Sequence, residues 1–171
     1  MDKANLFVLG LSKLFTDKVC RELAESLEMF YANVQEILEF ELMDLMEVES
    51  VCGVDYLLKQ ELSIVRRVST YDNTVVNGQL SALNHDKTYE SVKQNCLIIY
   101  LQQDKDSIMN DCEKEGLSES HLSINDDLFE DRDSLASAFS DVIVNVANLD
   151  ISHATKKVID SIVLYYSKKK V

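Results

Sequence analysis

Residues 6–27 of this chain read Leu6-Phe-Val-Leu-Gly-Leu-Ser-Lys-Leu-Phe-Thr-Asp-Lys-Val-Cys-Arg-Glu-Leu-Ala-Glu-Ser-Leu27, and they decide its fold. The unbroken apolar run at 6–9 predicts a short parallel strand that is covered on both faces, and Gly10 ends it. The period then changes to that of an amphipathic helix, which we expect to begin near Asp17. Its apolar stripe consists of Val19, Leu23 and Leu27.

A strand, a glycine turn and a helix in this order open a phosphate-binding βα unit. A working P-loop has the form G-x-x-x-x-G-K-[ST], in which backbone N–H groups surround the phosphates, the lysine reaches the outer phosphates and the hydroxyl binds magnesium. Counted from Gly10, the last three places hold Phe15, Thr16 and Asp17. The sequence therefore predicts the scaffold of a P-loop without its chemistry.

Two lysines and an aspartate near the loop could still allow it to bind phosphate. Lys13 or Lys18 could swing into the loop, and Asp17 could recruit magnesium. The alternative is that both lysines are ordinary solvated side chains.

Composition narrows the function classes. The net charge is −13, with 30 acidic and 17 basic residues, which argues against nucleic acid or an anionic membrane as a partner. The four cysteines are far apart, and the three histidines are isolated, so we expect reduced thiols, no metal site and a cytoplasmic protein. The length of 171 residues suits one domain covering 1–171.

After the first helix comes Phe30-Tyr-Ala-Asn-Val-Gln, where a second strand would deliver substrate-binding acids and Asn33 stands instead. At this point the chain resembles the shikimate kinases. With Gly10 on the first P-loop glycine, five further residues fall on that family's usual helix positions: Val19, Arg21, Leu23, Ala24 and Leu27. The resemblance implies an α/β fold with three layers, α/β/α, a five-stranded parallel sheet and the P-loop kinase topology.

The remaining pattern alternates between helices and strands, which supports parallel strands with right-handed crossovers. We expect strands from Thr74 onwards, at 96–101 and at 141–146, and a closing helix at 151–170 capped by Ser152. The other expected helices cover 36–51, 57–68, 88–95, 104–115 and 129–140. A lid-like segment falls at about 112–128.

The substrate-binding motifs of the family are altered. Its Gly-Glu-x-x-Phe-Arg-x-x-Glu segment, whose arginine pairs with the substrate carboxylate, keeps Gly53 and Glu61 but has Leu58 for the arginine. A leucine cannot replace a bidentate guanidinium, so we expect Leu58 to pack in the core. The family's run of three glycines beside the substrate falls on Gln79, Leu80 and Ser81, while Gly78 remains one residue early.

The family's lid arginines are also missing from this sequence, and its last conserved arginine has a second explanation. A kinase lid lays arginines on the transferring phosphates, but between Asp106 and Asp131 the only fixed positive charge is Lys114, so a plain surface loop is the better interpretation. Arg132 matches an arginine that the family keeps before the last strand. An ion pair with Asp131 or Asp133 on a helix surface explains Arg132 about as well.

The leading hypothesis is a shikimate kinase-like pseudoenzyme without phosphotransferase activity, kept as a binding or regulatory module for an unknown protein or small molecule, with no cofactor. The runner-up is an active kinase that uses Mg and ATP to phosphorylate shikimate or a related hydroxyl compound. A third hypothesis is a protein that never bound nucleotide and whose βα pattern only mimics the family.

Overall fold

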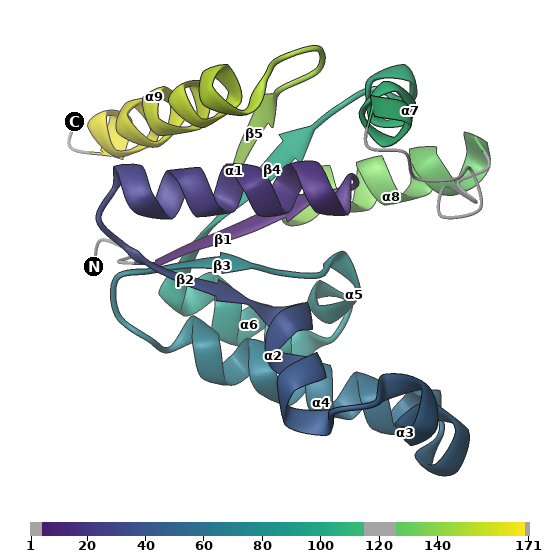
Figure 1. Ribbon diagram of the computed structural model, residues 1–171. Helices are drawn as coiled ribbons and strands as arrows, with labels where there is room; N and C mark the ends of the chain where they lie inside the picture. Colours follow the sequence, from purple (N-terminus) through teal and green to yellow (C-terminus); the bar gives the residue numbers. More distant parts are fainter. Residues whose placement is uncertain (1–4, 115–125, 170–171) are drawn as a thin grey trace.

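The computed structural model describes residues 5–114 and 126–169, and its centre is a sheet of five parallel strands (Figure 1). The spatial order of the strands is β2-β3-β1-β4-β5. This confirms the predicted α/β class and the five-stranded parallel sheet. The strands are β1 (Asn5–Gly10), β2 (Phe30–Asn33), β3 (Thr74–Asn77), β4 (Cys96–Gln102) and β5 (Val142–Asn145).

Helices cover both faces of the sheet. Two helices, α1 and α9, lie on one face, and the other face is covered mainly by α2, α4, α5, α6 and α8 (Figure 1). This is the predicted three-layer arrangement. The helices are α1 (Lys13–Ser26), α2 (Val34–Leu42), α3 (Leu45–Cys52), α4 (Val54–Ser69), α5 (Leu80–Leu83), α6 (Asp86–Asn95), α7 (Lys105–Lys114), α8 (Asp126–Phe139) and α9 (Ile151–Lys169).

The central strand β1 supplies side chains to two separate cores. Leu6 and Val8 pack with α1 and α9, whereas Phe7 and Leu9 pack with the helices of the opposite face. All four are at most 4% exposed, so the apolar run at 6–9 is buried on both faces as predicted. Because successive side chains of β1 point to opposite faces of the sheet, this one strand contributes to the cores on both sides.

The chain leaves neighbouring strands toward opposite faces beside β1. After β1 it enters α1 on one face, and after β3 it enters α5 and α6, whose buried residues pack on the other face. Such a switch in direction opens a crevice at the carboxyl ends of the strands, which is where open α/β sheets bind ligands. In this chain Gly10, Asn77 and Gln102 end the neighbouring strands β1, β3 and β4, so topology places the expected crevice beside them.

Several boundaries differ from the predictions. The first helix begins at Lys13 and not near Asp17, and the single helix expected at 36–51 is divided into α2 and α3. The division falls at Met43, whose backbone φ of 66° stops the helix. The closing helix is capped by Asp150, whose Oδ1 accepts the His153 N–H at 2.8 Å, so the expected cap Ser152 was wrong.

The lid-like segment predicted at about 112–128 falls largely on residues 115–125, which lie outside the described residues. Its two ends belong to α7 and α8. Among the described helices, none combines the length and apolar character that crossing a bilayer requires.

Gly78 is held against the core by a close approach to Phe7. A Cβ atom at position 78 would lie 2.0 Å from Phe7 Cζ, and Phe7 is fully buried. We expect Gly78→Ala to lower the free energy of unfolding by about 1–3 kcal/mol, measured by urea denaturation. In a Phe7→Leu background the same change should have a smaller effect, because the ring that it meets is gone. An equal loss in both backgrounds would contradict this packing.

Candidate functional site

The turn between β1 and α1 is shorter than a phosphate-binding loop. Gly10 ends the strand and Lys13 begins the helix, so only Leu11 and Ser12 lie between them. A P-loop surrounds phosphate with a run of non-helical backbone N–H groups that precedes its helix. Here most of the residues that would form the loop are helical, and the predicted scaffold is correct only in its strand and helix.

The Thr16 side chain fills the space beside Gly10. A Cβ atom built on Gly10 would lie 1.9 Å from Thr16 Oγ1, and Thr16 is 2% exposed. Its hydroxyl has no hydrogen-bond partner within the described residues. Gly10 is therefore required here for close packing of the helix on the strand, which is a structural reason distinct from ligand approach.

Asp17 lies one residue further along α1 and accepts three hydrogen bonds from side chains. Arg21 Nε donates to Oδ2 at 2.8 Å, and on Oδ1 the Tyr31 hydroxyl donates at 2.5 Å and Asn33 Nδ2 at 2.9 Å. Asn77 Nδ2 in turn donates to the Tyr31 hydroxyl at 3.2 Å. We call these five residues, Asp17, Arg21, Tyr31, Asn33 and Asn77, the Asp17 network.

The guanidinium of Arg21 closes the outer side of the Asp17 network. It forms an ion pair with Glu36 as well as with Asp17, and it lies 4.6 Å from the centre of the Tyr31 ring. The charge of Asp17 is thus neutralised within the protein. A cation that is already paired twice and stacked on an aromatic ring is poorly placed to hold a ligand phosphate.

The Asp17 network also sets the protonation of its members. Burial raises the pKa of Asp17, but hydrogen bonds from Arg21, Tyr31 and Asn33 outweigh it, so the pKa lies below the ordinary value of 3.8. Burial and the hydrogen bond to Asp17 raise the pKa of Tyr31 well above its ordinary value of 10.0. The carboxylate therefore stays charged and the phenol stays a donor at neutral pH.

The two lysines named as possible phosphate ligands lie on different sides of α1. Lys13 is exposed, and its charge faces Glu61. Burial raises the pKa of Glu61 above its ordinary value of 4.5, while the Ser81 hydroxyl at 3.0 Å and the charges of Lys13 and His85 act against that rise. The charge of Lys13 therefore acts on a carboxylate of the protein itself.

Lys18 lines a polar cavity of about 400 Å³ between α1, α7 and the loop that precedes α9. Ser107 also lines it, and the Ser107 hydroxyl is buried without a hydrogen-bond partner in the described part of the chain. Two carboxylates, Asp111 and Asp150, are among the lining residues. Within residues 5–114 and 126–169, no group of three or more His, Cys, Asp or Glu side chains could hold a metal ion.

The predicted substrate residues have structural roles. Leu58 is partly buried and packs against the core, as expected of it, and Leu80 does the same from α5. The Gly78 N–H donates to the Val8 carbonyl at 3.1 Å, which joins this turn to β1. Gln79 precedes α5 at the N-cap position without a side-chain hydrogen bond to the helix, so the place of the family's glycine run is the start of a helical turn in this chain.

Arg132 is exposed on α8, away from the Asp17 network. The ion pair predicted for Arg132 with Asp131 or Asp133 is not seen with either residue among the described residues. Asp133 instead accepts hydrogen bonds from the Tyr100 hydroxyl at 2.8 Å and from Gln102 Nε2 at 3.2 Å. Burial and this carboxylate raise the pKa of Tyr100, which keeps its hydroxyl protonated.

Sequence reasoning missed Arg21, Tyr31 and Asn77 as members of this site. Asn33 and Asn77 are the last residues of β2 and β3 and are partners in register. Polar residues at the carboxyl ends of neighbouring parallel strands were the available signal, because such ends meet at one edge of the sheet. The position of Tyr31, two residues before Asn33 and on the same face of β2, follows from strand alternation.

The contact between Gly10 and Thr16 can be tested by paired substitutions. We expect Gly10→Ala to lower the free energy of unfolding by about 1–3 kcal/mol, because the new methyl group meets the Thr16 hydroxyl. Thr16→Ala should relieve the clash, so that the double variant is more stable than the sum of the single effects predicts. Urea denaturation of all four proteins measures the coupling, and simple additivity would show that Thr16 does not fill this space.

The charge of Asp17 predicts a pH-dependent stability. Replacing it with Asn should cost about 1–2 kcal/mol at pH 7, because charge-assisted hydrogen bonds are lost. Since the folded pKa of Asp17 is depressed, this contribution is present above pH 3.8 and is lost as pH falls through the folded pKa. Urea denaturation at several pH values measures the difference between the two proteins.

The matched control for that measurement is Asp160→Asn. Asp160 is exposed on α9, and its replacement should change stability by less than about 0.5 kcal/mol at any pH. A difference between wild type and Asp17→Asn that persists undiminished in acid would show that the charge of Asp17 has no part in it.

The fold is shared with several solved kinases. Shikimate kinase from Acinetobacter baumannii, solved in complex with shikimate, superposes with a TM-score of 0.80 at 15% identity, covering 95% of this chain and 94% of that one. Shikimate kinase from Aquifex aeolicus gives 0.72 at 18% identity, covering 92% and 95%. A gluconokinase from Sinorhizobium meliloti gives 0.60 at 16% identity, covering 96% and 97%. At these identities the likeness shows the fold alone.

The sequence itself decides the family. It matches none of the curated proteins with which it was compared. The family model described as shikimate kinase, however, matches residues 17–163, which is most of the chain. That match, together with the parallel sheet and its strand order, overturns the hypothesis that the βα pattern only mimics the family: this chain belongs to the shikimate kinase family.

Proposed function

We propose that this protein is a shikimate kinase-family member that does not transfer phosphate and acts as a binding or regulatory module. One observation carries the proposal: Thr16 lies against Gly10 in a helix that begins at Lys13. The space beside Gly10 that a phosphate chain would need is taken up by the Thr16 side chain, and the Thr16 N–H already donates to the Ser12 carbonyl at 3.0 Å. Phosphoryl transfer depends almost entirely on positioning and charge stabilisation, so this arrangement removes its basis.

Electrostatics at the same turn support the proposal. A carboxylate within about 4 Å of a phosphate oxygen costs on the order of 4 kcal/mol at an effective dielectric constant near 20. Asp17 occupies the place where the motif requires a hydroxyl, and three hydrogen bonds hold it in position. To bind magnesium, this carboxylate would have to give up donors that already satisfy it.

The substrate side of the site gives a second line of support. Leu58, in the place of the family's carboxylate-binding arginine, packs against the core. The crevice therefore has no guanidinium at position 58 with which to hold an acid such as shikimate. With a net charge of −13, the proposed partner is a protein or a small molecule, with neither nucleic acid nor membrane as a target, and the proposed compartment is the cytoplasm.

An active kinase is the alternative, and two observations favour it. The N-terminus of α1 faces the crevice without a side-chain cap from Ser12, which leaves its first N–H groups available to an anion. The cavity lined by Lys18 and Ser107 lies beside the same helix and has room for a small ligand. On this alternative, ATP and Mg bind there and the protein phosphorylates shikimate or a related hydroxyl compound.

Calorimetric titration with Mg-ATP distinguishes the two functions. We expect no heat of binding up to about 1 mM nucleotide, corresponding to less than about 4 kcal/mol of binding free energy. A coupled assay of ADP release with shikimate should likewise stay at the background rate. The shikimate kinase from Aquifex aeolicus, run under the same conditions, is the positive control. Micromolar binding of Mg-ATP would refute the proposal and establish the alternative.

A further inference from the structure

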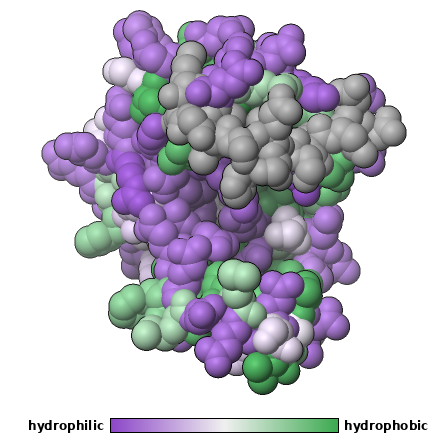
Figure 2. All heavy atoms as spheres, turned by 45° about the vertical axis from the view of Figure 1, so that its right-hand side comes forward, coloured by the Kyte–Doolittle hydropathy of each residue, from purple (hydrophilic) through white to green (hydrophobic). Residues whose placement is uncertain are grey.

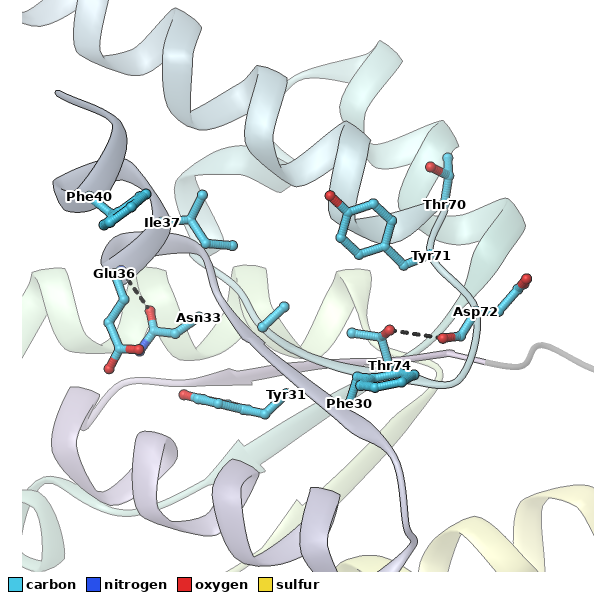
Figure 3. Close-up of a pocket in the computed structure, with 11 residues that line it drawn as sticks. Phe30, Tyr31, Asn33, Glu36, Ile37, Phe40, Thr70, Tyr71, Asp72 and Thr74 are labelled. Atoms are coloured by element: carbon cyan, nitrogen blue, oxygen red, sulfur yellow. Dashed lines mark hydrogen bonds between the residues drawn. The ribbon is translucent and has the colours of Figure 1, made fainter.

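A wide groove lies at the open edge of the sheet and borders the Asp17 network, because Tyr31 and Asn33 are also among its lining residues. Its volume is about 950 Å³. Strand β2 and the start of β3 form its floor, α2 forms one wall, and the loop between α4 and β3 forms the other. Figure 3 shows Ile37 of α2 and Tyr71 of that loop on opposite sides of the groove. We call this feature the edge groove; its main side chains are Phe30, Ala32, Ile37, Phe40, Tyr71 and Asp72.

Strand β2 is the edge of the sheet on this side and pairs only with β3. The Phe30 N–H donates to the Asn73 carbonyl at 2.8 Å, so the peptide groups of Phe30 face β3. Peptide groups alternate along a parallel strand, and those of Tyr31 therefore face outward, where another strand could pair with them. Proteins usually protect such an edge with lysine, proline or a bulge, yet β2 reads Phe-Tyr-Ala-Asn.

The aromatic side chains around this edge are unusually exposed. Phe30 is 73% exposed, Phe40 84% and Tyr71 46%. Single exposed apolar residues are ordinary, but three large rings around one groove form a patch of the kind that marks an interaction site. Aromatic side chains bring large contact area with few rotatable bonds, which suits them to recognise a partner.

The surroundings of the edge groove are strongly acidic. Between Arg21 and Lys59 the chain contains ten Asp or Glu residues and no Lys or Arg. Glu36 and Asp72 belong to the lining of the groove itself; Glu36 is paired with Arg21, whereas Asp72 has no ion pair in the described part of the chain. This charge disfavours a second copy of the chain as the occupant, because two molecules of net charge −13 repel each other. It favours a segment that carries positive charge.

The acidic character continues along α2 and α3, where further apolar residues are exposed. Met43 is 85% exposed, Met46 83% and Val51 76%. Figure 2 shows hydrophobic residues gathered among hydrophilic ones at the lower end of the molecule, where Figure 1 places α3 and the start of α4. A partner seated on the edge groove would meet more apolar and acidic surface beyond Phe40.

We propose that the edge groove binds an extended segment of a partner protein, in which apolar residues alternate with basic ones. The segment adds a strand beside β2. Its apolar side chains enter the groove between Ile37 and Tyr71, and a basic side chain lies near Asp72. Main-chain hydrogen bonds to the Tyr31 peptide groups give affinity, and the aromatic walls select alternate side chains. The proposal stands on the edge groove alone and is independent of the outcome of the nucleotide titration.

Fluorescence anisotropy with a synthetic probe tests the proposal on the full chain. The probe is a labelled peptide of about eight residues in which Lys and Val alternate, long enough to form a strand. We expect saturable binding, and we expect Phe30→Ser combined with Phe40→Ser to weaken it by roughly tenfold or more. Both side chains are exposed, so the fold should tolerate the changes. The matched control is Val163→Ser on α9, a residue that is 64% exposed, and it should bind as wild type does.

Two further probes separate strand addition from simple charge attraction. A Lys-Val peptide methylated on alternate backbone nitrogens keeps its charge but cannot pair with β2, and it should lose binding. A peptide in which Glu replaces Lys should also fail to bind. Equal binding of the methylated peptide, or of the Glu-Val peptide, would overturn the proposal. So would a dimer, seen by sedimentation, that Phe30→Ser converts to a monomer, because the occupant would then be a second copy.

Discussion

The contact between Gly10 and Thr16 determines the chemistry available at the carboxyl end of the sheet. Because position 10 lacks a side chain, α1 approaches β1 closely enough for the Thr16 hydroxyl to occupy the space beside it. The helix can then extend back to Lys13 and leave only two residues in the turn. A glycine that serves ligand approach in a phosphate-binding loop serves packing between a helix and a strand in this chain.

Strand β2 connects the two surfaces described above. Tyr31 and Asn33 donate hydrogen bonds to Asp17 of α1, and all four residues of the strand line the edge groove. One strand of four residues thus contributes side chains both to the Asp17 network and to an exposed apolar groove. A ligand that ordered this short strand from the groove side would also restrain the side chains that engage Asp17.

Much of the fold could be predicted because its signals are local and strong. The apolar runs at 6–9 and 96–101 are buried strands. The four-residue spacing of Val19, Leu23 and Leu27 correctly predicted the helix α1. The predicted start of that helix near Asp17 was wrong, because it assumed a loop as long as that of the P-loop motif. No glycine lies between Gly10 and Gly53, and Leu14 and Phe15 are ordinary helix formers, so nothing holds residues 13–16 out of the helix.

Other features had no signal in the sequence. The break at Met43 places a long side chain at a φ of 66°, which no local preference predicts. The Asp17 network depends on three elements that meet only after folding, since Asp17 is in α1, Tyr31 and Asn33 are in β2, and Asn77 is in β3. Charge and spacing identified Asp17 as unusual, but its donors could be named only when strand order and register were known.

The Asp17 network also bears on how this chain can change over many generations. Any replacement of Asp17 leaves Tyr31 and Asn33 without the carboxylate to which both donate. A lineage that moved toward the P-loop motif by that step would lose these hydrogen bonds before it gained any contact with phosphate. Such a change would have to alter the turn, the helix start and the strand ends together, so the hydrogen bonds of the Asp17 network oppose single substitutions at this site.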